Sequence, residues 1–177
     1  TPYLWKMHDV LDTATMAIDN KYLIPEKTKR DVRYHKIYKA WSVFYNNLNL
    51  KSEKRRIVIS LSGGVDSMSL LYTIKNWKEN SRTDIEIIAL HINFNNRKES
   101  YLEALYLQHW CKMIDIPIYV NEITEYKRDN TPRNEYEKKT RDLRFELYKE
   151  LMDGYEGGVV LGHIKEDIEE NFLRNIL

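Results

Sequence analysis

Cysteine is nearly absent from this chain: Cys111 is the only one among 177 residues. A single thiol excludes an internal disulfide and a metal site built from cysteines alone. The chain also has no large excess of charge of one sign, because its basic and acidic residues nearly cancel at a formal net charge of +1. The chain as a whole therefore supplies no strong field, and a nucleic-acid partner would need a local basic face.

Long apolar runs are also missing. No stretch approaches the length of a membrane span, and no signal peptide is visible, so we expect no membrane association and a cytoplasmic protein of a reducing compartment. The chain starts at Thr1 without a methionine and stops at Leu177 inside a helix-like repeat, which makes us expect a piece of a longer protein. Its length suits one domain with a sizeable core.

Apolar residues recur at helical spacing in residues 1–50. One stripe runs from Leu4 to Ile18 and another from Tyr34 to Leu48, with Pro25 between them. They predict a helical hairpin, which we assign to an N-terminal extension over residues 1–54. Segment 27–39 is basic with interleaved aromatic residues, and an RNA-contact helix and a merely solvated amphipathic helix explain it equally well.

From residue 55 onward, strand-like and helix-like patterns alternate. Strands are predicted near 56–61, 85–92, 116–120 and 158–162, and helices near 66–79, 99–114, 134–152 and 166–177. β-branched residues such as Ile85, Ile87 and Ile88 favour parallel strands covered on both faces. The predicted fold class is α/β, with an open, doubly wound, mostly parallel sheet over residues 55–177. Ligands of such sheets bind beyond the carboxyl ends of the strands.

Two further features of the predicted α/β region are its single cysteine and a long polar loop. Cys111 falls on the helical stripe Ala104, Leu107, Cys111 and Ile114, which favours a buried core cysteine over a reactive thiol. The loop 121–133 is long and polar and is a candidate substrate loop.

The turn after the first predicted strand, Ser62–Ser67, reads Ser-Gly-Gly-Val-Asp-Ser. Glycines let the backbone approach an anion, and N–H groups of the turn and of the first helical turn can bind phosphate. Ser62 and Ser67 can add hydroxyl donors, and Asp66 can reach a magnesium ion. The motif is neither the Gly-Lys-[Ser/Thr] P-loop nor a Gly-x-Gly-x-x-Gly dinucleotide loop. An ordinary strand-to-helix turn is the alternative, and all six residues standing between a strand and a helix argue against it.

This turn resembles the PP-loop of the ATP pyrophosphatases, which split ATP between the α and β phosphates. Three further motifs are similar to the catalytic domain of the tRNA(Ile)-lysidine synthetase family: His91–Arg97, Arg141–Phe145 with its Arg-x-x-Arg-aromatic pattern, and Leu161–Glu170. The resemblance covers roughly residues 55–177 and implies the adenine nucleotide alpha hydrolase-like fold. It also implies a ligase that adenylates the C2 oxygen of a wobble cytidine, after which the amine of free lysine expels AMP. ATP and Mg²⁺ are the implied cofactors, and tRNA, at its anticodon region, is the implied partner.

The resemblance assigns roles to individual residues. The implied ATP-binding residues are Ser62, Gly63, Gly64, Val65, Asp66, Ser67, Leu90 and His91, with Asp66 also the magnesium ligand. The implied catalytic residues are Asp66, His163, Asp167, Arg141 and Arg144. Structural explanations for these residues stay open. The histidines can serve packing or capping, the arginines can lie on a solvated helix face, and Asp167 can be favoured by the dipole at a helix N-terminus.

This chain departs from the family pattern at several positions. Ile164 replaces the second histidine of a Gly-His-His stretch, Glu166 replaces an aspartate, and Phe94-Asn95-Asn96 replaces a His-Gly pair. Three alternative functions therefore remain: tRNA thiolation, adenylation of a small molecule, and a non-catalytic nucleotide- or RNA-binding module. The thiolases often carry paired cysteines, which a lone Cys111 cannot supply.

Overall fold

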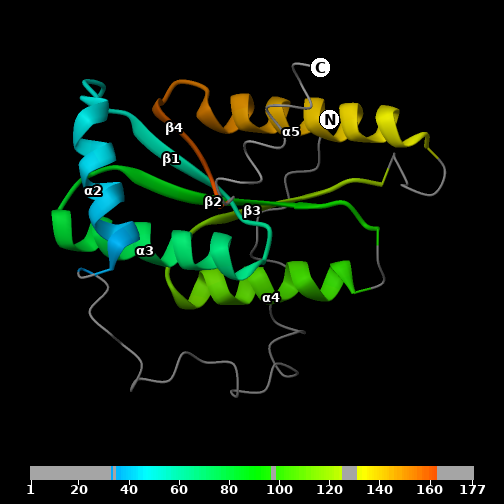
Figure 1. Ribbon diagram of the computed structural model, residues 1–177, viewed down its shortest axis with the longest axis horizontal. Helices are drawn as coiled ribbons and strands as arrows, with labels where there is room; N and C mark the ends of the chain where they lie inside the picture. The colour runs from blue at the N-terminus through cyan, green and yellow to red at the C-terminus, as the bar shows by residue number, and fades with distance from the viewer. Residues whose placement is uncertain (1–32, 34, 97–98, 125–130, 163–177) are drawn as a thin grey trace.

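The computed structural model describes residues 33, 35–96, 99–124 and 131–162. In this part of the chain a parallel sheet lies between helical layers (Figure 1). Its strands are β1 (Arg55–Ser60), β2 (Glu86–Asn93), β3 (Ile118–Glu122) and β4 (Glu156–Leu161), in the order β3-β2-β1-β4. Each neighbouring pair is parallel. The predicted α/β fold with a doubly wound parallel sheet is confirmed.

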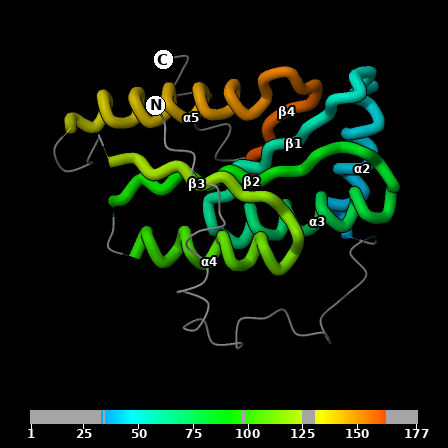
Figure 2. Tube along the Cα trace, turned by 180° about the vertical axis from the view of Figure 1, so that it is seen from behind, coloured from blue at the N-terminus to red at the C-terminus, as the bar shows by residue number. Residues whose placement is uncertain are grey.

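The described helices are α2 (Lys36–Leu48), α3 (Val65–Ser81), α4 (Ser100–Met113) and α5 (Arg133–Met152). Helices α3 and α4 cover one face of the sheet, and α5 covers the other (Figures 1 and 2). From β1 the chain moves outward through β2 to β3 and then returns to place β4 on the other side of β1. The connections diverge at the carboxyl ends of β1 and β4, the position where open α/β sheets bind ligands.

Alternate residues of β1 supply two separate cores. Ile57 and Ile59 pack with the side chains of α3 and α4, whereas Val58 packs on the opposite face with Leu147 and Leu151 of α5. Successive side chains of a strand point to opposite faces, so a strand buried on both sides needs apolar residues throughout. Complete burial of each such side chain contributes about 1.5–3 kcal/mol, which makes β1 a rigid support for the turn that follows it.

Helix α2 joins the core on the α3 side. Trp41 is buried there and packs edge-on against Trp77 of α3, with ring centroids 5.8 Å apart. The predicted helix is present, but its predicted apolar stripe is only partly buried: Ile37 and Phe44 are exposed, and Tyr38 and Tyr45 pack beside Trp41 instead. Lys36 and Lys39 are exposed. The stripe from Leu4 to Ile18 and most of the basic segment 27–39 lie outside the described residues, and a domain division at residue 54 stays a prediction.

The element boundaries differ little from the predicted ones. The largest shift is in β3, predicted at 116–120, which begins at Ile118. Ile116 is buried in the core ahead of the strand, and Pro117, which has no N–H, takes part only through its carbonyl, which accepts from Ala89 N at 2.8 Å. Cys111 is buried, as predicted, and burial raises the pKa of its thiol to about 12. Within the described part of the chain, no helix is both long and apolar enough to span a membrane. The helix predicted at 166–177 lies outside the described residues.

Candidate active site

The Ser62–Ser67 turn connects the end of β1 to the start of α3. Leu61 is buried, and its N–H donates to the carbonyl of Leu90 on β2 at 2.8 Å, which holds the chain in the sheet up to the turn. Gly63 then takes φ +88°, a left-handed conformation that glycine adopts without a steric penalty. Gly64 is the N-cap of α3, and no side chain caps this helix. The N–H groups of its first turn lack intrahelical acceptors and can bind an anion.

The two serine hydroxyls of the turn belong to a closed ring of hydrogen bonds. Gly64 N donates to Ser62 Oγ at 3.3 Å, and Ser67 Oγ donates to the carbonyl of Gly64 at 3.0 Å. The hydroxyls themselves lie 3.1 Å apart, and because Ser67 uses its proton on Gly64, Ser62 is the donor of this pair. The ring fixes the shape of the turn from within, so the backbone amides of the first helical turn stay directed outward.

A pocket of about 340 Å³ opens beside this turn, at the carboxyl ends of three strands. It is lined by Ser60, Leu61 and Ser62 after β1, His91, Ile92, Asn93, Phe94 and Asn96 from β2 onward, Gly162 after β4, Ser67, Ser100 and Glu103 on α3 and α4, and Arg144 on α5. Gly63 and Gly64 line a neighbouring hollow of about 490 Å³ on the α4 side. The turn therefore separates two hollows and can hold an extended ligand across both.

Gly162 is required by the close approach of β4 to α3. A Cβ at this position would lie 2.7 Å from the Cα and 2.8 Å from the backbone nitrogen of Ser67. Only a glycine lets the chain pass so near to the first turn of α3. This contact places Gly162 directly against the first turn of α3, where the predicted phosphate site begins.

His91 is buried in the pocket wall and fixes the end of β1. Its Nδ1 lies 2.8 Å from the carbonyl oxygen of Leu61. A carbonyl can only accept, so Nδ1 carries a proton, and in the neutral ring Nε2 keeps a lone pair. Burial lowers the pKa of His91, against the opposing effects of the Leu61 hydrogen bond and the charge of Glu103. His91 is therefore a neutral group with a structural role, and its ring also borders the pocket.

The structure separates the two candidate arginines. Arg144 lines the pocket, with its guanidinium 5.9 Å from the centre of the Phe94 ring. Arg141 is exposed on the same helix and has an ion pair of 4.0 Å with its neighbour Asp142. Arg144 is thus the arginine that a ligand in this pocket can reach.

The other predicted residues occupy varied positions. Val65 and Asp66 are exposed in the first turn of α3. The Leu90 side chain is buried in the core under α5, and its carbonyl is the acceptor for Leu61, so only its backbone lies near the site. His163 and Asp167 lie outside the described residues, and their roles stay predictions.

Asp66 is the one predicted metal ligand. Among the described residues, no group of three or more His, Cys, Asp and Glu side chains could hold a metal ion together. Mg²⁺ commonly binds through one or two carboxylates together with substrate phosphates and waters, and an exposed carboxylate beside a phosphate-binding turn fits that pattern. Asp66 would hold Mg²⁺ in this way only when the nucleotide is present.

Several pocket residues were given no role from the sequence, although Asn93 and Asn96 belong to the quoted His91–Arg97 motif. Ser60, Asn93, Asn96, Ser100 and Glu103 all line the pocket. What these residues share is their place in the chain: each lies at or just beyond the end of a strand, or near the start of the helix that follows a strand. Only that position could have indicated them from the sequence. Tyr148 reinforces this edge, because its hydroxyl donates to Ser60 Oγ at 2.9 Å.

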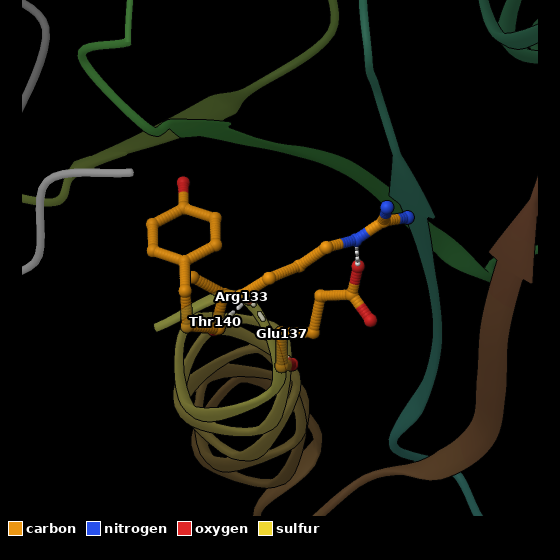
Figure 3. A network of polar contacts seen from close by, with 4 residues as sticks. Arg133, Glu137 and Thr140 are labelled. Atoms are coloured by element: carbon orange, nitrogen blue, oxygen red, sulfur yellow. Dashed lines mark hydrogen bonds and ion pairs between the residues drawn. The ribbon is translucent and has the colours of Figure 1, made fainter. Parts of the chain in front are cut away.

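A smaller hollow of about 230 Å³ adjoins the pocket at the start of α5, and Asn96 lines both. Arg133 Nε and Glu137 Oε1 form an ion pair of 2.8 Å across one helical turn (Figure 3). Thr140 lies on the next turn and donates to the carbonyl of Tyr136 at 2.8 Å. The hollow therefore offers a cation and an anion side by side.

Comparison with known proteins identifies the family of this chain. The family model described as the PP-loop domain matches residues 33–177. The chain belongs to the PP-loop family. It is 34% identical over 125 residues to a tRNA(Ile)-lysidine synthase of Streptococcus pyogenes serotype M3, covering 70% of this chain and 27% of that protein. A tRNA(Ile)-lysidine synthase of Enterococcus faecalis is 33% identical over 123 residues, covering 68% and 25%. The predicted resemblance is confirmed.

A solved structure shares the fold of this PP-loop chain. The U34-tRNA thiolase NcsA from Methanococcus maripaludis, solved with its [4Fe-4S] cluster, superposes with a TM-score of 0.58 at 12% identity. The match covers 79% of this chain and 50% of that one. At that identity the likeness supports the fold alone. The chain spans about a quarter of the length of the curated synthases that it matches.

Proposed function

We propose that this chain carries the ATP-binding and adenylating site of a tRNA-modifying ligase of the lysidine-forming type. The observation that supports it most is the Ser62–Ser67 turn, which leads into the uncapped N-terminus of α3 at the edge of a pocket that Arg144 also lines. In the first step, the C2 oxygen of a cytidine attacks the α phosphorus of ATP, and the bond to pyrophosphate breaks. In the second, the amine of lysine forms a bond to C2, the C2–O bond to AMP breaks, and the amine loses its proton.

The residues divide this work by charge. The first-turn amides of α3 bind the departing pyrophosphate, where negative charge accumulates. Arg144 supplies planar donors at the opposite side of the pocket and stabilises the α phosphoryl group during transfer. Asp66 would hold Mg²⁺, which would neutralise phosphate charge once bound. His91 keeps the end of β1 in place and offers the Nε2 lone pair as an acceptor.

The small hollow beside the pocket fits an amino acid as the nucleophile. Glu137 can accept a hydrogen bond from the ammonium group of an amino acid, and Arg133 can bind its carboxylate in a bidentate manner. These two contacts would replace the ion pair that Arg133 and Glu137 now form with each other. Because Asn96 lines both hollows, a ligand here lies next to the adenylation pocket. Glu137→Gln is expected to raise the KM for lysine while leaving the Kd for ATP unchanged. Equal KM values for lysine in both proteins would contradict this placement.

Pyrophosphate release with total tRNA, measured with and without lysine, tests the function. We expect release that depends on tRNA, and a product whose mass exceeds that of the substrate RNA by lysine minus water on a cytidine. A transcript with cytidine at the wobble position should react, and one with uridine should not, because uracil presents a carbonyl where cytosine presents an amine.

Other outcomes would replace this function. A sulfur-for-oxygen gain would indicate tRNA thiolation, although the single cysteine of this chain is buried and its pKa of about 12 leaves the thiol protonated. Pyrophosphate release with small molecules alone would indicate a small-molecule adenylase. Nucleotide binding without any turnover would indicate a non-catalytic module.

A further inference from the structure

The segment Phe94-Asn95-Asn96 turns sharply after β2. The Asn93 side chain is buried, and its Oδ1 accepts from Asn95 N at 2.9 Å, which starts the turn. Asn95 then takes φ +53°, in the left-handed region that asparagine tolerates better than most residues. An asparagine can therefore occupy the conformation for which glycine is the usual choice, and its side chain adds a contact to Glu122 of β3 at 2.8 Å.

This segment also holds the first half of α5. Before Leu147, Thr140 is the only buried side chain of this helix, so little apolar packing fixes its start. Asn96 compensates through its amide, which donates to the hydroxyl of Tyr136 at 2.8 Å. The contact ties the first turns of α5 to the segment that follows β2.

Phe94 meets α5 at the pocket. The Arg144 guanidinium lies 5.9 Å from the centre of the Phe94 ring, within the range of a cation–π interaction, and both residues line the pocket. Within the described part of the chain no carboxylate pairs with this guanidinium. Its donors are therefore available to an anionic ligand, while the ring limits the directions in which the long side chain can point.

We propose that Phe94 is a positioning residue that acts on the nucleotide through Arg144. The aromatic ring holds the guanidinium at the pocket wall before the ligand arrives, so less side-chain freedom is lost when the phosphate binds. The identity of the ligand as ATP rests on the function proposed above. The geometric claim, that Phe94 matters only while Arg144 is present, can be tested by binding alone.

A double-mutant cycle in ATP affinity tests the claim. Calorimetry with ATP and Mg²⁺, without RNA, is performed on the unaltered chain, Phe94→Leu, Arg144→Gln and the double variant. Phe94→Leu should weaken binding about two- to fivefold, the effect of an exposed cation–π contact. In the Arg144→Gln background, Phe94→Leu should change the Kd for ATP by a smaller factor than it does in the unaltered chain, because no guanidinium remains for the ring to position. Phe94→Tyr keeps the ring and should keep the affinity.

Two controls make each outcome decisive. Phe44→Leu makes the same chemical change on an exposed ring of α2 and should leave the Kd unchanged. If Phe94→Leu does not fold, Phe94→Met is the second ring-free variant for the same cycle. Equal losses of affinity in both Arg144 backgrounds, or no loss in either, would overturn the inference. ATP binding that shows the expected coupling, with no pyrophosphate release on any RNA, would instead reject the proposed function and leave this inference intact.

Discussion

Gly162→Ala should damage the site without touching any ligand. The added Cβ would lie 2.7 Å from Ser67 Cα, whereas ordinary contacts of a Cβ begin near 3.4 Å. The neighbour is backbone at the first turn of α3, so it cannot move aside as a flexible side chain could. The end of β4 and the start of α3 must then separate by several tenths of an ångström, at a cost of about 1–3 kcal/mol for such overpacking.

Urea unfolding followed by circular dichroism measures this cost. With a denaturant slope of about 2 kcal/mol/M, a loss of about 2 kcal/mol lowers the midpoint by roughly 1 M. Gly158→Ala is the matched control, because a Cβ there would have nothing within 4 Å. ATP affinity should fall in Gly162→Ala as the phosphate-binding turn shifts, and should persist in the control. Equal midpoints for the two variants would refute the reasoning.

Three other changes have defined outcomes. Asp66→Ala should keep its fold, because the side chain is exposed, and should lose ATP-dependent pyrophosphate release; unchanged turnover would reject Asp66 as the metal ligand. Cys111→Ala should cost on the order of 1 kcal/mol in urea unfolding, and thiol reagents should label native Cys111 slowly, since its pKa is raised to about 12. Stability should fall as pH drops through 6.5, because burial lowers the pKa of His91 and the unfolded chain then takes up a proton that the folded chain excludes; His91→Gln should reduce this slope between pH 7.5 and 5.5.

The order of strands and helices could be predicted because periodicity and the Ser62–Ser67 motif agree with each other. The segment Ile57–Ile59 is buried on both faces and has no polar position. That pattern alone indicates a parallel sheet with helices packed on both of its faces. The strand order was not accessible in the same way. It depends on β4 pairing with β1 across nearly a hundred residues, and the close approach of Gly162 to Ser67 that accompanies it leaves no local pattern.

The candidate site was predictable in its chemistry and not in its choice of residues. Arg141 and Arg144 are three residues apart and so differ by roughly 60° around a helix, which left either one able to face the sheet. Tertiary packing decides between them, because burial of Leu147 and Leu151 fixes the rotation of α5 and brings Arg144 to the pocket. The position of Asn96 also depends on tertiary structure, since its hydrogen-bond partner Tyr136 lies forty residues away in the sequence.

The hydrogen bonds around Ser62 and Ser67 bear on how the motif would bind phosphate. The sequence predicts that Ser62 and Ser67 can donate hydroxyls to phosphate; in the structure Ser67 Oγ donates to the carbonyl of Gly64, and the two hydroxyls lie within hydrogen-bond distance of each other. Phosphate binding by either hydroxyl would require this ring to open and would forfeit bonds that hold Gly64 at the helix start. The backbone amides of the first turn carry no such cost, because they lack acceptors within the helix. In the function proposed above, these amides would therefore bind the phosphates, and the positive charge that phosphate transfer demands would come from Arg144 and the ion that Asp66 would bind.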